Sequence, residues 1–239
     1  MSRGISYSVD EKIFENFPGY VRGVVVASGV TNVESPATLV ALLRDAEDAL
    51  RSQVSVERLA EHPRIASWRE AFRSFGARPS DYRSSIEAMA RRVLRGQELP
   101  SINALVDIGN IVSLRHMIPV GGHDFGVMRA DVALRFAAGT EEFFAIGSDE
   151  AERPEPSEVV FAEGDTVLTR RWVWRQGVHT AATLETTHVE INVDGMPPVS
   201  ADDVKRACGE VAELVKRFCD GETRIEMLSE DNPVIRLGL

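Results

Sequence analysis

Residues 101–124, SINALVDIGNIVSLRHMIPVGGHD, constrain the fold more than any other segment of this chain. If Ser101 caps a helix, the apolar residues after it surround nearly the whole helical cylinder, because successive residues are turned by about 100°. A helix that is apolar on every side has to be buried, so the rest of the chain must wrap around this one. Its apolar residues are Ile102, Leu105, Val106, Ile108, Ile111, Val112 and Leu114.

Two polar residues interrupt this apolar helix. Asp107 and Asn110 lie three positions apart and therefore project from neighbouring turns into the interior. An unpaired carboxylate would be costly there, so both side chains need partners. One interpretation is that they bind backbone amides of the following loop, as buried polar groups commonly do. The other is that they face a cavity, and the two interpretations are compatible.

The loop PVGGHD follows the helix directly. Gly121 and Gly122 allow backbone amides to approach a ligand closely, because glycine has no side chain. Histidine titrates near neutral pH, so His123 is the candidate catalytic group, with Asp124 as a neighbour that could orient it. Adjacent side chains rarely point the same way, and the alternative is that His123 only lines the pocket. The candidate ligand-binding residues in this region are Asp107, Asn110, Gly121, Gly122 and Asp124.

The first half of the chain begins with two expected strands and continues with helices. Residues 6–17 alternate in the manner of a strand, and residues 20–30 are a β-branched run typical of a buried strand. Helices are predicted over residues 35–54, 55–76 and 78–96, with Ser35 capping the first. Ser84, followed three residues later by Glu87, is a capping box for the third. We therefore interpret this serine as a cap, and the chain contains no G-x-S-x-G motif.

The second half is predicted to be mostly sheet. Beyond residue 130 the chain is rich in β-branched and aromatic residues, interrupted by an exposed loop at residues 148–158. Ser200 and Asp203 cap a further helix, and residues 224–229 form a closing strand. The chain length suits a single domain over residues 1–239. Its parts are a helix-rich stretch over 35–128, a sheet-rich stretch over 130–195 and a C-terminal helix over 200–220.

A strand is expected over TRRWVWRQG, residues 169–177. Alternation would place Arg171 and Arg175 on one face, away from the tryptophans. One interpretation is a tryptophan core with solvated arginines, and the other is that the two guanidinium groups bind a carboxylate or a nucleic-acid phosphate. Thr186 and Thr187 in the next strand are either ordinary β residues or, for one of them, a hydroxyl that lines the pocket.

Composition limits the partners of the protein. The net charge of −10 argues against broad attachment to nucleic acid and in particular against DNA binding, so any RNA contact must be local. The arginines that could make such a contact form two small groups: Arg91, Arg92 and Arg95, and Arg170, Arg171 and Arg175.

Other classes of function are disfavoured. No apolar stretch is long enough for a bilayer, and no signal segment begins the chain, so we expect no membrane association and a cytoplasmic location. Cys208 and Cys219 lie about three turns apart in one expected helix and cannot pair. The histidine and cysteine spacings match no zinc signature, so we expect neither a metal site nor a cofactor.

The residues SINALVDIGNIV, Pro119 and Asp124 resemble the motif S-I-D-A-V-V-D-x-x-N-Y-V, proline and aspartate of the B3/B4 domain in the β subunit of bacterial phenylalanyl-tRNA synthetase. The chain is similar to free-standing B3/B4 proteins over most of residues 20–195, including RSSIEAMARR, PVGGHD and RRWVWRQG. The resemblance implies a three-layer α/β fold, with a β-sandwich of unusual topology flanked by helices.

In the synthetase, the resembling pocket hydrolyses tyrosine wrongly joined to phenylalanine tRNA, by positioning a water and the ester rather than by a protein nucleophile. Gly121 stands where the synthetase has a histidine, and His123 stands where an aromatic residue is typical. The resemblance therefore implies a protein that binds the tRNA 3′ end or an aminoacyl compound. Hydrolysis of mischarged aminoacyl-tRNA in trans is the corresponding activity. The alternatives are a non-catalytic tRNA or amino-acid binding module, and a small-molecule hydrolase unrelated to tRNA.

Overall fold

Side-chain alternation on β10 (His188–Gly195) determines how the layers are arranged. This strand pairs antiparallel with β2 (Val21–Ser28) at the centre of a sheet. Its odd-numbered residues Val189, Ile191 and Val193 belong to the core beneath the helices. Its even-numbered residues, Glu190, Asn192 and Asp194, are also buried but point toward a second sheet. The two faces of β10 therefore have opposite polarity.

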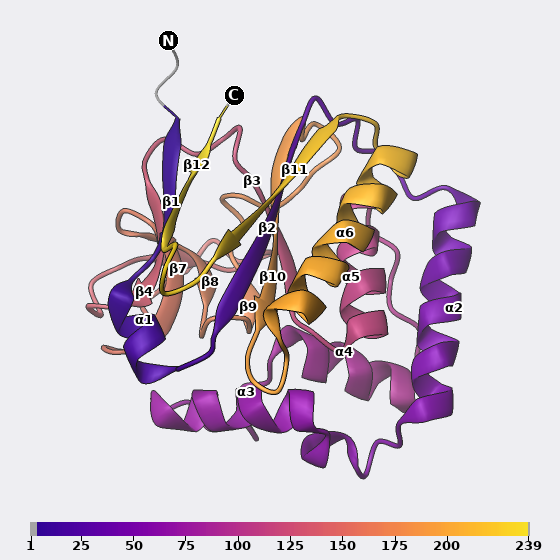
Figure 1. Ribbon diagram of the computed structural model, residues 1–239, viewed down its shortest axis with the longest axis horizontal. Helices are drawn as coiled ribbons and strands as arrows, with labels where there is room; N and C mark the ends of the chain where they lie inside the picture. Colours follow the sequence, from indigo (N-terminus) through magenta and orange to yellow (C-terminus); the bar gives the residue numbers. More distant parts are fainter. Residues whose placement is uncertain (1–3, 239) are drawn as a thin grey trace.

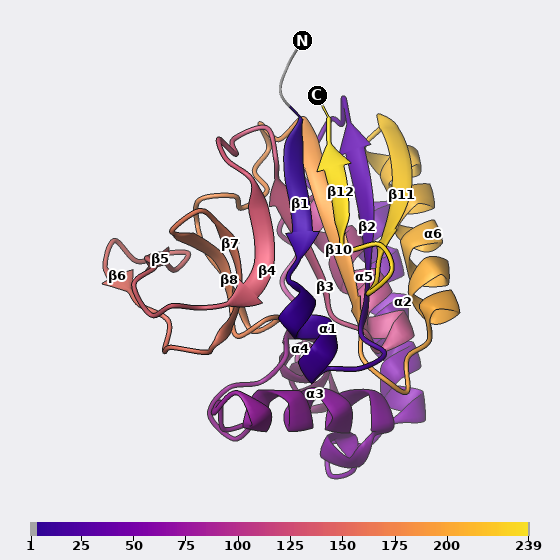
Figure 2. The same cartoon turned by 60° about the vertical axis from the view of Figure 1, so that its left-hand side comes forward.

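The computed structural model describes residues 4–238, and these residues form three layers (Figures 1 and 2). A six-stranded sheet lies against a four-stranded sheet, and helices cover the outer face of the four-stranded sheet. Strands β1 and β4 run parallel, whereas the other neighbouring strands are antiparallel. This mixed α/β architecture is the fold class that the sequence predicted. No helix in the described range is long and apolar enough to span a membrane.

The order of the strands shows which of them lie at an edge. The six-stranded sheet consists of β12 (Val234–Leu237), β1 (Ile5–Val9), β4 (Val132–Phe136), β7 (Val159–Glu163), β8 (Thr166–Arg170) and β9 (Arg175–Gln176). The four-stranded sheet consists of β11 (Glu222–Leu228), β2, β10 and β3 (Val120–Asp124). A separate short pair is formed by β5 (Phe143–Phe144) and β6 (Ala151–Glu152). Strand β3 is thus an edge strand.

The helices lie mainly in the first half of the chain. They are α1 (Glu11–Asn16), α2 (Ala37–Gln53), α3 (Pro63–Ser74), α4 (Ser85–Leu94), α5 (Ala104–His116) and α6 (Ala201–Phe218), with a 3-10 turn at Leu59–Glu61. Figures 1 and 2 show α3 and α4 together below the lower ends of the two sheets, whereas α5 and α6 cover the four-stranded sheet. The helices predicted over residues 35–96 are therefore present, but the helix expected over residues 55–76 begins only at Pro63, after the 3-10 turn.

Helix α5 is buried as its apolar pattern predicted, but it begins later than expected. Its cap is Asn103, whose side chain accepts a hydrogen bond from the amide of Val106, and not Ser101. Ser35 is not a cap either, because α2 begins after Pro36 without a side-chain capping bond. Both serines instead donate to a buried carboxylate of α5, which is described with the site.

The other predicted caps are present, but Ser84 makes only one half of the expected capping box. The side chain of Ser84 accepts a bond from the amide of Glu87 at the start of α4. Ser200 and Asp203 form a reciprocal capping box at the start of α6. Cys208 and Cys219 are buried free thiols.

Three predictions of strands were wrong in part. Residues 6–17 are not one strand, because Asp10 accepts a hydrogen bond from the amide of Lys12 and starts α1. Residues 169–177 turn back on themselves between β8 and β9, with positive φ angles of 45° at Arg171 and 64° at Trp172. Thr186 and Thr187 lie before β10 rather than within it.

Candidate functional site

A cavity of about 400 Å³ lies between α5 and the edge strand β3. Leu105 and Val106 of α5 form one wall, and Val189 and Ile191 of β10 form another. Asn110 and Gln176 are the polar side chains in its lining, together with backbone of β3. A cavity of this size and polarity is typical of a site for a small ligand. We call it the apolar chamber.

Glycines create space in the apolar chamber rather than unusual backbone geometry. Gly109 on α5 and Gly121 and Gly122 on β3 line it, and none of these three has a positive φ. A Cβ on Gly109 would lie 3.7 Å from the side chain of Val120, within ordinary contact distance. A larger side chain at this position would therefore project into the chamber and fill it.

A second, smaller cavity of about 90 Å³ lies on the other face of β3, between the two sheets. Its lining includes Arg22, His123, Asn192 and Asp194, and we call it the polar cavity. Val120, Gly121 and Gln176 border both cavities. The chamber and the polar cavity are thus separated by little more than the backbone of one strand.

A buried ion pair organises the polar cavity. The Nε atom of Arg22 lies 2.8 Å from Oδ1 of Asp194, and both side chains are almost fully buried. The carboxylate also accepts hydrogen bonds from the hydroxyl of Tyr20 and, at 2.8 Å, from Nδ2 of Asn192. Arg22 donates a further bond to the hydroxyl of Tyr7 across the sheet interface. Several donors therefore fix the position of this carboxylate.

The amide of Asn192 has a defined orientation. Because its nitrogen donates to Asp194, its oxygen has to point the other way. This Oδ1 atom has no hydrogen-bond partner among the described residues, and a Cβ on Gly121 would lie 3.2 Å from it. Because Gly121 has no side chain, there is room for this buried, unpaired acceptor at the wall between the two cavities.

His123 is a neutral side chain in this site. It is only 2% exposed, and burial lowers the pKa of its imidazole to about 3, with the positive charges of Arg22 and His179 adding to the effect. Its Nδ1 lies 2.6 Å from Oγ1 of Thr180, and its Nε2 lies 3.1 Å from Oγ1 of Thr169. At neutral pH this histidine can form hydrogen bonds, but it does not carry the extra proton of an imidazolium acid.

Glu190 lies beside His123, because the two residues are paired in the register of β10 and β3. Its side chain is fully buried, and neither carboxyl oxygen has a hydrogen-bond partner within residues 4–238. Burial raises the pKa of this carboxyl to about 8. The group is therefore neutral at neutral pH, which removes the penalty of a buried unpaired charge.

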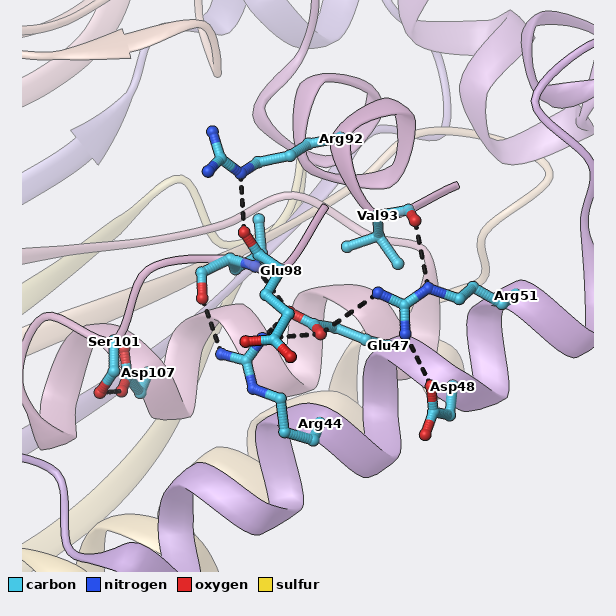
Figure 3. Close-up of polar contacts among 10 residues, drawn as sticks. Arg44, Glu47, Asp48, Arg51, Arg92, Val93, Glu98, Ser101 and Asp107 are labelled. Atoms are coloured by element: carbon cyan, nitrogen blue, oxygen red, sulfur yellow. Dashed lines mark hydrogen bonds and ion pairs between the residues drawn. The ribbon is translucent and has the colours of Figure 1, made fainter. Parts of the chain in front are cut away.

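The two polar residues of α5 have different roles. Asn110 lines the apolar chamber, as the cavity interpretation expected. The carboxylate of Asp107 instead accepts a hydrogen bond from the hydroxyl of Ser101 (Figure 3). It also accepts bonds from the hydroxyl of Ser35, at 2.7 Å, and from the amide of Ile102, at 3.1 Å. Local partners therefore satisfy Asp107, and it holds the start of α5 in place.

A second buried acid anchors the segment that leads into α5 (Figure 3). Glu47 of α2 accepts a 2.7 Å bond from the amide of Leu99 and is paired with Arg44 at 2.7 Å. Arg44 also donates to the carbonyl of Leu99 at 2.7 Å. These contacts fix the segment before α5 to α2.

Asp124, Thr186 and Thr187 lie outside the linings of the two cavities. Asp124 accepts hydrogen bonds from the amide of Gly126, at 2.8 Å, and from the hydroxyl of Thr186, at 2.7 Å. Thr187 is exposed. The contacts of Asp124 connect the end of β3 to the segment before β10, and thereby support the edge of the site.

The structure separates Arg171 and Arg175, because the turn between β8 and β9 replaces the expected continuous strand. Arg171 is only 6% exposed, and its guanidinium lies 3.6 Å from the ring centre of Tyr82 and 4.6 Å from that of Trp174. The side chain of Arg175 is 44% exposed and lines the polar cavity. The expectation of one shared face was therefore wrong.

Several residues of the polar cavity were not among the predicted site residues: Arg22, Thr169, Gln176, Asn192 and Asp194. For some of these residues the sequence contained a pattern that could have predicted them. Arg22 interrupts the β-branched run of β2, and HVEINVDG places two acids and an asparagine on one face of a strand whose other face is aliphatic. Within residues 4–238, no group of three or more histidine, cysteine, aspartate or glutamate side chains is arranged to hold a metal ion.

The whole lining of the apolar chamber, and that of the polar cavity apart from Arg22, falls within a segment that matches a known protein family. The family model of the B3/4 domain matches residues 67–224, which is more than half of the sequence. The chain therefore belongs to the B3/4 domain family. The match includes α4, α5, strand β3 and the β8–β9 turn.

Among curated proteins, none matches the chain. Among solved structures, the chain is similar to an N-terminal fragment of the phenylalanyl-tRNA synthetase β-subunit from Pyrococcus horikoshii, with a TM-score of 0.48 and 11% sequence identity. The similarity covers 92% of this chain and 50% of that one, so the chain spans about half the length of the fragment.

Proposed function

We propose that this B3/4 protein binds the aminoacylated 3′ end of a tRNA, or a related aminoacyl compound, and hydrolyses the ester in trans. The observation that supports the proposal most directly is the apolar chamber beside β3, with Asn110 and Gln176 as polar groups in its lining. The segment that matches the B3/4 domain family contains this whole lining, which is consistent with a role for the chamber in the function of the domain. A cytoplasmic location, where aminoacyl-tRNA is made, belongs to the same proposal.

The lining of the chamber indicates a class of aminoacyl group. Apart from Asn110 and Gln176, its side chains are aliphatic, and its volume of about 400 Å³ accommodates a large amino-acid side chain. Burial of apolar surface contributes roughly 25 cal/mol per Å² to such binding. We therefore propose that the favoured amino acids have apolar side chains.

The proposed reaction requires no protein nucleophile. A water adds to the ester carbonyl, the bond from the acyl carbon to the ribose oxygen breaks, and a proton from the water passes to the departing ribose oxygen, which becomes a hydroxyl. The products are a free amino acid and an uncharged tRNA end. Positioning of the water and hydrogen bonds to the carbonyl oxygen supply the acceleration, which suffices for an activated ester.

Individual residues have separate parts in this proposal. His123, neutral and held by two threonines, is a hydrogen-bonding group rather than a general acid. The exposed guanidinium of Arg175 contacts a phosphate of the terminal nucleotide, and buried Arg171 positions Trp174 beside it. Asn110, Gly121 and Gly122 border the aminoacyl group, while Asp107, Asp124 and Thr186 hold these segments in place.

A non-catalytic binding module is the second candidate, and one observation favours it. Among the described residues, the only histidine in either lining is His123, whose pKa of about 3 makes it a weak base. If positioning alone proves insufficient for turnover, the same chamber would retain an aminoacyl group without releasing it.

The proposal is tested with purified protein and a panel of tRNAs charged with apolar, aromatic, polar and charged amino acids. We expect release of apolar amino acids and at least a tenfold loss in Gly109→Phe, which fills the chamber. Gly209→Ala on α6, where an added Cβ meets no atom within 4 Å, is the control and should behave as wild type. If the charged tRNAs bind but no amino acid is released, the non-catalytic binding module is supported instead of hydrolysis. If neither binding nor release is found, the proposal is overturned.

A further inference from the structure

Positive charge is concentrated in one segment of this acidic protein. Residues 63–95, which include α3 and α4, contain eight arginines and no lysine, against only Glu70, Asp81 and Glu87 as acids. The whole chain has a net charge of −10, so the remaining residues are strongly acidic. A polyanion would be repelled by most of the surface and attracted to this part of it.

Three of these arginines converge on one buried carboxylate. Glu87 lies 2.7 Å from Nη1 of Arg69, 2.9 Å from Nε of Arg91 and 4.0 Å from Nε of Arg83. Glu87 itself is buried, whereas the three guanidinium-bearing side chains remain partly exposed. Glu87 holds Arg69 and Arg91 by hydrogen bonds, and Arg83 lies nearby. One negative charge therefore faces three positive charges, which leaves two of them in excess at the surface.

A surface hollow lies next to this group. Its volume is about 420 Å³, and its lining includes Arg69, Arg73, Arg78 and Ser80. The side chain of Arg78 is 82% exposed and is paired with Asp81 at 2.8 Å, whereas Arg73 has no acidic partner among the described residues. Guanidinium groups bind phosphate oxygens through paired N–H bonds, so this hollow has the donors that a phosphate needs. We call the five residues Arg69, Arg73, Arg78, Arg83 and Arg91 the arginine surface.

The arginine surface continues to the candidate site. Ser85, the first residue of α4, lines the polar cavity, and its amide donates a 2.7 Å bond to the carbonyl of Val173. Tyr82 packs against Trp174, with their ring centres 5.0 Å apart, and both rings are partly exposed. An extended strand of nucleic acid could therefore follow the surface from the hollow to Arg175, with aromatic rings on which a base can stack.

We propose that the arginine surface binds the phosphate backbone of the RNA whose aminoacylated end enters the apolar chamber. That this RNA is a tRNA rests on the proposed function. The attraction of an RNA backbone to this surface rests on the charge distribution alone. An acidic protein segment would also be attracted to arginines. RNA is the better fit because the surface leads to a pair of partly exposed aromatic rings and a cavity, which a nucleotide uses and a carboxylate-rich peptide does not.

The test compares Arg73→Glu/Arg78→Glu with Lys216→Glu/Arg217→Glu, a control with the same change of charge at the exposed end of α6. Binding of uncharged tRNA is measured by fluorescence anisotropy over a series of salt concentrations. We expect the arginine variant to weaken binding at least tenfold at low salt and the control less than twofold. In Arg73→Ala/Arg78→Ala the slope of log affinity against log salt should fall by about 1.5, since each phosphate contact contributes roughly 0.7 to 0.9.

A second measurement separates this inference from the proposed function. Release of the amino acid from an aminoacyl-adenosine ester, which has no RNA backbone, should be unchanged in Arg73→Glu/Arg78→Glu and lost in Gly109→Phe. If wild type and Arg73→Glu/Arg78→Glu bind tRNA equally well, the proposed role of the arginine surface is overturned, and the proposed role of the apolar chamber is unaffected. Loss of tRNA affinity without ester release by wild type would support the surface and overturn hydrolysis. Binding of a polyglutamate peptide in place of tRNA would assign the surface to a protein partner and overturn the RNA proposal. Circular dichroism melting confirms that each variant is folded.

Discussion

The two faces of β10 meet opposite surroundings. On the helix side, Val189, Ile191 and Val193 join an aliphatic core, and two of them border the apolar chamber. On the other side, Glu190, Asn192 and Asp194 are equally buried, yet they carry two carboxyl groups and an amide into the space between the sheets. The first face is stabilised by burial of apolar surface. The second is stabilised by the ion pair of Asp194 with Arg22 and by protonation of the Glu190 carboxyl. The two faces should therefore respond differently to mutation, pH and ligands.

The largest expected effect is on the polar face. Asp194→Ala leaves the guanidinium of Arg22 buried without its carboxylate, and loss of one partner of a buried pair costs about 3–5 kcal/mol. Urea unfolding measures the change in free energy. The double variant Arg22→Met/Asp194→Leu should recover most of this loss, because it removes both charges. A cost below about 1 kcal/mol for Asp194→Ala would show that water reaches Arg22.

A truncation on the apolar face should cost less. Ile191→Ala removes aliphatic atoms from the core, and such changes cost about 2–5 kcal/mol. Because Ile191 also borders an existing cavity, we expect the lower end, about 2–3 kcal/mol, in the same urea assay. A cost equal to that of Asp194→Ala would contradict the contrast between the faces.

Only the polar face should add a dependence of stability on pH. The folded-state pKa of Glu190, about 8, lies above its ordinary value of 4.5, so the folded protein keeps a proton that the unfolded chain releases. The contribution of this group is therefore fully favourable below about pH 4.5 and declines as the pH rises to about 8. The decline is at most about 1.4 kcal/mol per pH unit. Stability measured from pH 5 to 8 should fall less steeply in Glu190→Gln, and parallel curves would refute the assignment.

The smallest expected effect concerns Asp107, the buried carboxylate on the helix side of the sheet. Ser35→Ala removes one of the hydrogen bonds to the Asp107 carboxylate, and we expect a loss of about 1 kcal/mol. Ser52→Ala, whose hydroxyl bonds only to the carbonyl of Ala49 within its own helix, is the matched control and should change stability by less than about 0.5 kcal/mol. Equal effects of the two substitutions would mean that Asp107 is solvated.

Much of the fold follows from local patterns that the sequence displays. The apolar helix at residues 104–116, the cap at Ser84 and the β-branched run of β2 are short-range signals, and each formed the predicted element. The β8–β9 turn was not predictable in this way, because its left-handed residues are Arg171 and Trp172 rather than glycine. Tertiary contacts of Arg171 with Glu158 and Tyr82 accompany that conformation.

The site was only partly predictable for a similar reason. Asn110, Gly121 and Gly122 are close in sequence and line the apolar chamber together. The polar cavity combines Arg22 with Asp194, which are far apart in the chain and meet only because β2 and β10 are neighbours. Alternation shows that these residues share a buried face, but strand pairing decides which of them meet.

Gly121 has a consequence for the communication between the two cavities. Its backbone belongs to both linings, and no side chain separates them at that point. A ligand in one cavity that displaces this strand would also change the shape of the other cavity. Two ligands bound in the chamber and in the polar cavity would then change each other's affinity by equal factors. The edge strand β3 would then be a movable wall that the two cavities share.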